Sequence, residues 1–187
     1  MTRETTDIPG CSVVRLFRHE DARGEFVKIF QATTARAGGD DPTIGELFWS
    51  RSHAGVVRGL HFQVPPDDHT KVVTIIAGRA FDVVLDLRVG SPAYGTHIAV
   101  ELDAAAPAAV VVPVGCAHGF QATVDDTVML YATSTEHAPE SDRGIRWDSA
   151  GIAWPLPAVA ISDRDGGFPA LDAYTSPFVF SEAGATR

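Results

Sequence analysis

The chain has 187 residues, of which 45% are hydrophobic and 21% are charged, and its formal net charge is −9. This length suits a single domain, residues 1–187 with a core at about 11–171, and the composition excludes a largely disordered chain. Because the chain is acidic, has no run of basic residues and has no apolar run of about 20 residues, we expect a cytoplasmic protein that binds neither nucleic acid nor membranes.

Short runs rich in Val, Ile and Phe, separated by turn residues, predict an all-β fold. The predicted strands are residues 11–17, 24–31, 44–52, 56–63, 71–77, 80–88, 97–102, 108–112, 118–122, 127–133 and a short one at 158–161. One or two helical turns are expected at 32–37, ended by the Gly-Gly-Asp-Asp-Pro sequence at 38–42. Five prolines beyond residue 138 predict an irregular C-terminal tail of loops and short turns.

The sequence Pro-x-Gly-x-x-His at residues 113–118 resembles the turn-then-strand element of cupin-like proteins. This resemblance implies a double-stranded β-helix, or jelly roll, with a ligand site at its mouth. The fold class expected is therefore an all-β jelly roll with short helical turns.

Four side chains on predicted strands carry the chemistry: His61, Lys71, His118 and Tyr131. A histidine is the natural general base near neutral pH, a lysine can stabilise an oxyanion, and a tyrosine can return a proton. Together these groups fit proton removal next to a carbonyl, which is the chemistry of racemases, epimerases and isomerases.

A metal or other cofactor is not expected, because Lys71 would repel a cation and the usual His-x-His pair is replaced by His61-Phe62-Gln63. Two alternatives stay open at this point. His61, His69 and His118 could form a three-histidine site of a metal-dependent cupin enzyme, and Cys116 beside His118 could form a nucleophile pair.

The chain resembles the dTDP-4-dehydrorhamnose 3,5-epimerase family over about residues 15–171. The motifs that carry the resemblance are Arg-Gly-Leu-His-Phe-Gln at 58–63, Phe-Asp-Val-Val-Leu-Asp-Leu-Arg at 81–88, Ser-Pro-x-Tyr-Gly at 91–95, Pro-x-Gly-x-Ala-His-Gly-Phe at 113–120, Tyr131, Gly-Ile-Arg-Trp-Asp at 144–148 and Trp154-Pro155. They occur in the order and spacing of that family.

The resemblance implies a homodimer that epimerises a nucleoside-diphosphate 4-keto-6-deoxyhexose at C3, C5 or both, without a cofactor, in the biosynthesis of rhamnose or of another deoxysugar. It makes His61 the base, Lys71 the group that stabilises the 4-enolate, and Tyr131 the acid on the opposite face. Asp165 is expected to be the carboxylate partner of His61, with Asp163 as the alternative. Some relatives act at a single centre, and the sequence does not show which centres this chain inverts.

The resemblance also implies the substrate-binding residues Arg23, Lys28, Glu46, Phe48, Arg58, Gln63, His118, Asp142 and Arg164. Arg23 and Arg58 match positions that contact the nucleotide or its diphosphate. Lys28, Glu46 and Phe48 depart from the family pattern, which usually has a carboxylate at the first position and amides at the other two. These departures leave open whether the base is thymine, and a CDP-linked sugar is the first alternative. A separate alternative to catalysis is a sugar-nucleotide binding module that uses the same pocket.

Overall fold

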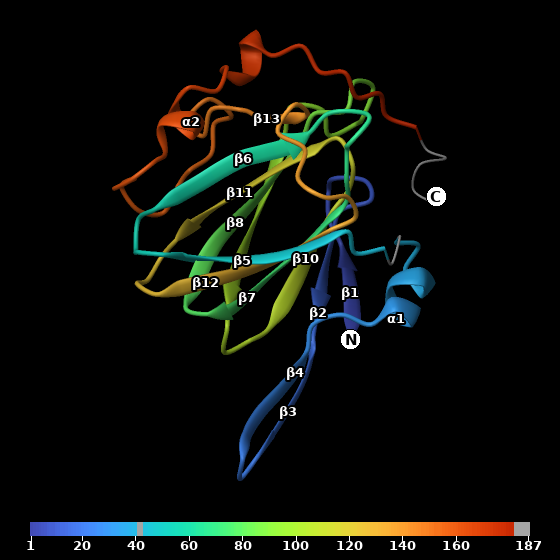
Figure 1. Cartoon of the computed structure of the whole chain (residues 1–187), viewed down its shortest axis with the longest axis vertical. Helices are drawn as coiled ribbons and strands as arrows, with labels where there is room; N and C mark the ends of the chain where they lie inside the picture. Colours follow the sequence, from blue (N-terminus) through green and yellow to red (C-terminus); the bar gives the residue numbers. More distant parts are fainter. Residues whose placement is uncertain (41–42, 182–187) are drawn as a thin grey trace.

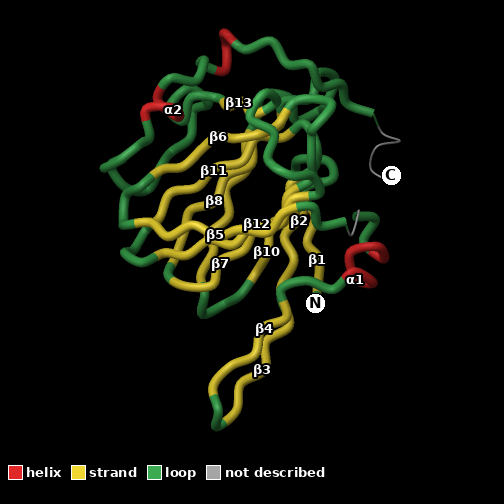
Figure 2. Tube along the Cα trace, viewed as in Figure 1, coloured by secondary structure: helices red, strands yellow, loops and turns green. Residues whose placement is uncertain are grey.

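The computed structural model describes residues 1–40 and 43–181 of the chain, and strands make up most of its regular structure (Figure 2). The strands are β1 (Thr2–Thr5), β2 (Ser12–Arg15), β3 (Phe17–Asp21), β4 (Gly24–Lys28), β5 (Glu46–Ser52), β6 (Val57–Gln63), β7 (Lys71–Ala77), β8 (Arg79–Asp86), β9 (His97–Asp103), β10 (Ala108–Val112), β11 (Cys116–Ala122), β12 (Thr127–Thr133) and β13 (Asp142–Gly144). The helices are short: α1 (Ala32–Ala37), α2 (Asp163–Gly166) and the 3-10 turn η1 (Leu171–Ala173). No helix of the described ranges is long and apolar enough to cross a membrane.

Two antiparallel sheets face one another, as in a jelly roll (Figure 1). The first sheet has the order β1-β2-β10-β7-β12-β5, and the second has the order β13-β6-β11-β8-β9. A third pair, the hairpin β3–β4, projects away from both sheets (Figure 1). The predicted all-β jelly roll is therefore confirmed, and its non-consecutive strand neighbours are the crossovers that this fold requires.

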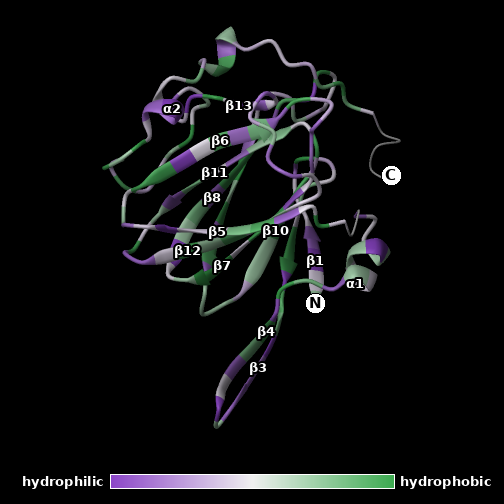
Figure 3. Ribbon diagram, in the orientation of Figure 1, coloured by the Kyte–Doolittle hydropathy of each residue, from purple (hydrophilic) through white to green (hydrophobic). Residues whose placement is uncertain are grey.

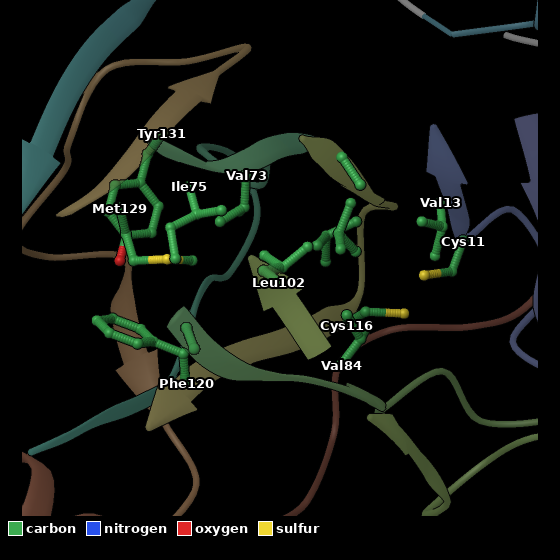
Figure 4. Packing of buried hydrophobic residues seen from close by; sticks show 14 of the residues in the cluster. Cys11, Val13, Val73, Ile75, Val84, Leu102, Cys116, Phe120, Met129 and Tyr131 are labelled. Atoms are coloured by element: carbon green, nitrogen blue, oxygen red, sulfur yellow. The ribbon is translucent and has the colours of Figure 1, made fainter. Parts of the chain in front are cut away.

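Apolar side chains from both sheets fill the space between them, and Tyr131 lies beside Met129 in this core (Figure 4). A second apolar cluster, which includes Leu60 and Phe62, lies on the other face of the second sheet, where Phe178 of the C-terminal tail packs on it. Strand β6 therefore buries alternate residues in opposite directions. The consequence for function is that His61 and Gln63 are directed toward the interior between the sheets.

The predicted strands occur, but several bounds differ: the strand predicted at 44–52 begins at Glu46, that at 80–88 runs from Arg79 to Asp86, and that at 118–122 begins at Cys116. The larger differences are at the first two strands and at the last. The prediction for residues 11–17 was wrong at its end, because Leu16 interrupts the pairing and a separate strand, β3, begins at Phe17. The prediction for residues 24–31 extended too far, since β4 ends at Lys28. The segment 158–161 forms only an isolated bridge between Ala160 and Val56.

The helix α1 has the predicted bounds, and it is followed by Gly38. Asp41 and Pro42, which belong to the predicted stop signal, lie outside the described residues. Hydropathy mapped on the ribbon shows why the hairpin was not predicted: β3 is largely hydrophilic, unlike the strands of the core (Figure 3).

Candidate active site

A cavity of about 290 Å³ opens between the two sheets near the ends of β5, β6 and β7. The residues that line it are Glu46, Phe48, His61, Phe62, Gln63, His69, Lys71, Thr133, His137, Asp142 and Arg164. Its volume is at the lower end of the range for small-molecule sites, about 300–1,000 Å³. A cavity of this size accommodates a sugar ring and leaves a larger substituent to extend out of its mouth.

His61 and Asp165 form a buried pair at one wall of this cavity. The Nε2 atom of His61 lies 2.8 Å from Oδ1 of Asp165, and the backbone N–H of Gly59 donates to Oδ2 of the same carboxylate at 3.0 Å. Asp165 is 4% exposed, whereas Asp163 of the same helical turn is exposed. Of the two carboxylates considered from the sequence, Asp165 is therefore the one that contacts the histidine.

Helix α2 explains this placement. Ser162 caps the helix by accepting a hydrogen bond from the backbone N–H of Asp165 at 3.1 Å, as serine commonly does at a helix N-terminus. The cap fixes the turn so that Asp165 faces β6 while its neighbours face solvent. With Nε2–H donated to the carboxylate, Nδ1 is the ring nitrogen that remains available to accept a proton.

The ionisation of the pair suits a general base. Burial lowers the pKa of His61 below its ordinary value, and the hydrogen bond and the charge of Asp165 oppose this effect only in part. Burial acts to raise the pKa of Asp165, but the hydrogen bonds from His61 and from the Gly59 backbone hold that pKa below its usual range. The histidine is thus neutral and the carboxylate ionised near neutral pH.

Lys71 lies beside His61 at the start of β7. Its Nζ donates a hydrogen bond to the backbone carbonyl of His61 at 2.9 Å. Burial lowers the pKa of this lysine to about 8; the nearby charge of Asp142 opposes the change, and that of Arg164 adds to it. Asp142 and Arg164 pair with one another at 2.5 Å across the cavity wall. Among the ion pairs of the described residues, none involves Lys71.

Tyr131, the predicted acid, is adjacent to this cavity but does not line it. The ring of Phe48 stacks on the phenol ring, with centroids 4.8 Å apart and an interplanar angle of 13°. The hydroxyl of Tyr131 lies 3.3 Å from Oγ of Ser50, the next inward residue of β5. Burial raises the pKa of the phenol well above its ordinary value, so the phenol is protonated near neutral pH.

His118 lies behind Tyr131. Its ring is 4% exposed, and its Nε2 is 2.7 Å from Oδ2 of Asp82, a fully buried carboxylate. The two aromatic rings of His118 and Tyr131 meet edge to face at 6.1 Å. The expectation that His118 lines the ligand pocket was therefore wrong: it supports Tyr131 from the core side, and Phe48 lies on the cavity side.

Two other predicted binding residues, Gln63 and Glu46, line the cavity and hold nearby loops. Gln63 uses its amide to fix a loop, donating to the carbonyl oxygens of Asp67 and Glu136 and accepting from the N–H of Ala138. Glu46 lines the cavity and accepts from the N–H of His137 at 2.8 Å.

The guanidinium of Arg58 lies against strand β5. Its Nε donates to Oγ of Ser52 at 3.0 Å, and its charge lowers the pKa of Tyr131 slightly against the larger effect of burial. Arg58 is therefore close to the phenol and not on the cavity wall. Its position fits a group at the edge of the site.

Arg23 and Lys28 do not line the cavity of the single chain, so their part in substrate binding stays a prediction. Both belong to the β3–β4 hairpin, which projects from the sheets (Figure 1). Arg23 pairs at the hairpin tip with Asp21 at 2.6 Å. The sequence places these residues in a motif, but the direction in which a hairpin projects is set by tertiary packing.

Two histidines of the cavity wall, His69 and His137, were not predicted as binding residues. His69 accepts or donates at Nδ1 toward Thr135 and Gln63, and burial lowers its pKa to about 3, so the ring is neutral. Its place two residues before Lys71 was the available signal, because alternate residues of an extended segment share a face.

The described residues contain no group of three or more His, Cys, Asp or Glu side chains arranged to hold a metal ion. The three histidines of the alternative metal site have separate partners: Asp165 for His61, Thr135 and Gln63 for His69, and Asp82 for His118. The Cys116 thiol is buried, and burial raises its pKa strongly, which argues against a nucleophile.

Comparison with known proteins identifies relatives of the whole domain. The family model for dTDP-4-dehydrorhamnose 3,5-epimerase matches residues 5–173. A dTDP-4-dehydrorhamnose 3,5-epimerase of Sinorhizobium fredii is 36% identical over 172 residues, which cover 90% of this chain and 88% of the relative.

Solved structures agree with this match. The rmlC epimerase of Mycobacterium tuberculosis superposes with a TM-score of 0.88 at 36% identity, covering 92% of this chain and 89% of the other. The dTDP-6-deoxy-D-glucose-3,5-epimerase of Legionella pneumophila, solved in complex with dTDP-4-keto-L-rhamnose, has a TM-score of 0.91 at 29% identity and covers 96% of this chain and 99% of the other.

Proposed function

The chain belongs to the dTDP-4-dehydrorhamnose 3,5-epimerase family and is a deoxysugar epimerase, and from this premise we propose its substrate and the roles of its residues. The substrate is a nucleoside-diphosphate 4-keto-6-deoxyhexose, which loses and regains a proton at C3, C5 or both. The observation that carries this proposal is that a neutral histidine paired with a carboxylate and an ammonium group line one cavity large enough for a hexose ring.

His61 acts as the base through Nδ1. It takes the proton from the carbon next to the C4 carbonyl, and the electron pair of the broken C–H bond moves onto the carbonyl oxygen. Asp165 stabilises the imidazolium that forms, because it accepts the Nε2–H and carries a full negative charge. The pair thus lowers the free energy of the charge-separated state more than that of the neutral ground state.

Lys71 stabilises the enolate oxygen as its charge develops. The phenol of Tyr131 then donates its proton to the carbon from the opposite face, which inverts the centre. The resulting phenolate regains a proton from solvent, and the His61 imidazolium releases its proton to solvent. The hydrogen bond of Tyr131 with Ser50 and the charge of Arg58 both favour the transient phenolate. Each proton removed is thereby replaced, and no oxidant or reductant is required.

The nucleotide extends out of the cavity past Glu46, Arg58 and Arg164. A thymidine diphosphate is the leading candidate, because the relatives in this comparison are dTDP-sugar enzymes by name. A cytidine diphosphate is the second candidate. The carboxylate of Glu46 on the cavity wall favours it, since a carboxylate accepts hydrogen bonds from an exocyclic amine.

The protein acts as a homodimer. The outward face of strand β5 exposes Leu47 and Trp49 at 62% and 60%, and the hairpin exposes Phe17 and Phe26 at 49% and 57%. Large exposed apolar residues such as these are typical of an interaction surface. Conversion to a monomer by Trp49→Glu, measured by light scattering, tests this assignment.

Incubation in heavy water tests the reaction itself. The protein should introduce deuterium at C3, C5 or both of a dTDP-linked 4-keto-6-deoxyhexose without added metal, and His61→Ala should abolish the exchange. A panel of dTDP-, CDP-, UDP- and GDP-linked sugars identifies the base. Equal turnover of the dTDP and CDP forms would reject selection by Glu46, and absence of exchange with every sugar would reject the substrate class. Product identity places the reaction in rhamnose formation or in the synthesis of another deoxysugar.

A further inference from the structure

Phe48 separates the two halves of the catalytic machinery. It lines the cavity together with His61 and Lys71, and its ring lies flat on the phenol of Tyr131, with centroids 4.8 Å apart. Phe48 and Tyr131 are direct cross-strand partners in the β5–β12 ladder, so this contact is fixed by the register of the sheet. A sugar in the cavity therefore meets Phe48 before it meets the acid.

The two rings differ in how firmly they are held. Tyr131 is 8% exposed and lies within the core cluster (Figure 4). The edge of the His118 ring and the Ser50 hydroxyl also contact it. Phe48 is 42% exposed and lies on β5, which is an edge strand of its sheet. The phenylalanine ring is therefore partly open to solvent, whereas the phenol is enclosed. Access to the acid is thus set by the position of Phe48.

Inversion of two centres makes a geometric demand that inversion of one centre does not. C3 and C5 are the two ring carbons bonded to the C4 carbonyl carbon. The sugar must therefore turn in the cavity to bring first one and then the other between His61 and Tyr131. The Phe48 ring lies between the cavity and the phenol, because Phe48 lines the cavity and stacks on Tyr131, which does not line it.

We propose that Phe48 is a specificity-determining residue that admits only one orientation of the sugar ring to Tyr131 and so restricts the protein to one of the two centres. This inference rests on the proposed function, since it assumes His61 as base and Tyr131 as acid. Phe48 takes no part in proton transfer. It limits which carbon of the enolate can reach the phenol proton.

The test compares the two centres within one reaction in heavy water. The wild-type protein should invert one centre. Inversion with deuterium entry at the second centre should be at least about tenfold slower. Phe48→Ala opens the passage to the phenol and should raise the ratio of second-centre to first-centre inversion by about tenfold or more, while the rate at the first centre changes less. Proton NMR of the product sugar resolves both positions.

Two control variants separate bulk from other effects. Phe48→Leu keeps an apolar side chain in front of the phenol and should retain the single-centre product. Arg15→Ala, on β2 and away from β5, removes an exposed pair with Glu4 and should leave the ratio unchanged. If the wild type inverts both centres at similar rates, or if Phe48→Ala keeps the wild-type ratio, the inference is wrong. If no variant exchanges any proton, the proposed function fails instead.

Discussion

Replacement of Asp165 by asparagine tests the catalytic base by exchanging one carboxylate oxygen for an NH₂ group. The carboxylate accepts two buried N–H groups, one from Nε2 of His61 at 2.8 Å and one from the backbone of Gly59 at 3.0 Å. An amide has a single acceptor oxygen and can satisfy only one of them. If that oxygen faces Gly59, the amide NH₂ faces Nε2 and selects the tautomer with the proton on Nδ1, the atom that must be free.

The other orientation is also unfavourable, because the amide NH₂ then opposes the N–H of Gly59. A buried donor without a partner costs about 1–3 kcal/mol. The variant in addition loses the attraction between carboxylate and imidazolium, about 4 kcal/mol for full charges 4 Å apart at an effective dielectric constant of 20. With about half of that charge developed in the transition state, the total is roughly 3–5 kcal/mol, or about a 10²–10⁴-fold loss in kcat.

The assay is the initial rate of deuterium entry from solvent into the 4-keto sugar, measured beside the rate of inversion. Asp163→Asn is the matched control: it makes the same chemical change two residues away, at an exposed position of the same helix. We expect that control to retain its activity within about twofold, as surface changes usually do. Comparable rates for Asp165→Asn and the wild type, or equal losses in both variants, would refute the role of Asp165.

Three further predictions follow from the same geometry. Burial lowers the pKa of His61 below its ordinary value and that of Lys71 to about 8. The value of kcat/KM should therefore rise with pH as the histidine loses its proton and fall above about pH 8 as the lysine loses its proton. Lys71→Arg should move the alkaline fall to higher pH, and an unmoved fall would assign it to another group. Tyr131→Phe should reduce inversion at least about tenfold more than it reduces deuterium exchange, as measured by NMR, because the first proton transfer does not need the phenol; equal reductions would exclude it as the separate acid. Gly59→Ala should lower the free energy of unfolding by roughly 2–4 kcal/mol, since Gly59 has φ +132° and the added methyl would lie 2.5 Å from the backbone of β11. Thermal unfolding checks this against Gly90→Ala, which shares a positive φ (+87°) but adds its methyl in open space, so the larger loss at Gly59 measures the steric contact.

The strands of the core could be predicted because their sequences carry the physical cause of their burial. β8 places its apolar residues inside the protein on both faces, with Asp82 and Asp86 held by specific partners. The edge strand β1 (Thr2–Thr5) has no such signal, since all its residues are exposed and only its pairing with β2 makes it a strand. Strand β13 is three residues long and depends in the same way on β6.

The site shows a similar division. The residue types at positions 61, 71 and 131 indicated a base, an oxyanion group and an acid, and position 165 was one of two candidate carboxylates. The sequence could not show which side chain lies between the base and the acid. Phe48 is an ordinary aromatic residue of an edge strand, and only the register of β5 against β12 places it on Tyr131. Similarly, Arg23 could not be excluded from the cavity until the direction of its hairpin was known.

The depressed pKa of Lys71 has a consequence for catalysis that follows from differential binding. Its ammonium is buried beside the carbonyl of His61, and within the described part of the chain no carboxylate forms an ion pair with it. A cation held in this state is stabilised little in the free protein, so an anion that forms next to it gains more than it would from a lysine already paired. The carbonyl of the ground-state sugar carries no such charge, but the enolate does. The same burial that makes Lys71 a weak base therefore makes it selective for the transition state, because its electrostatic contribution is realised only when His61 has removed the proton.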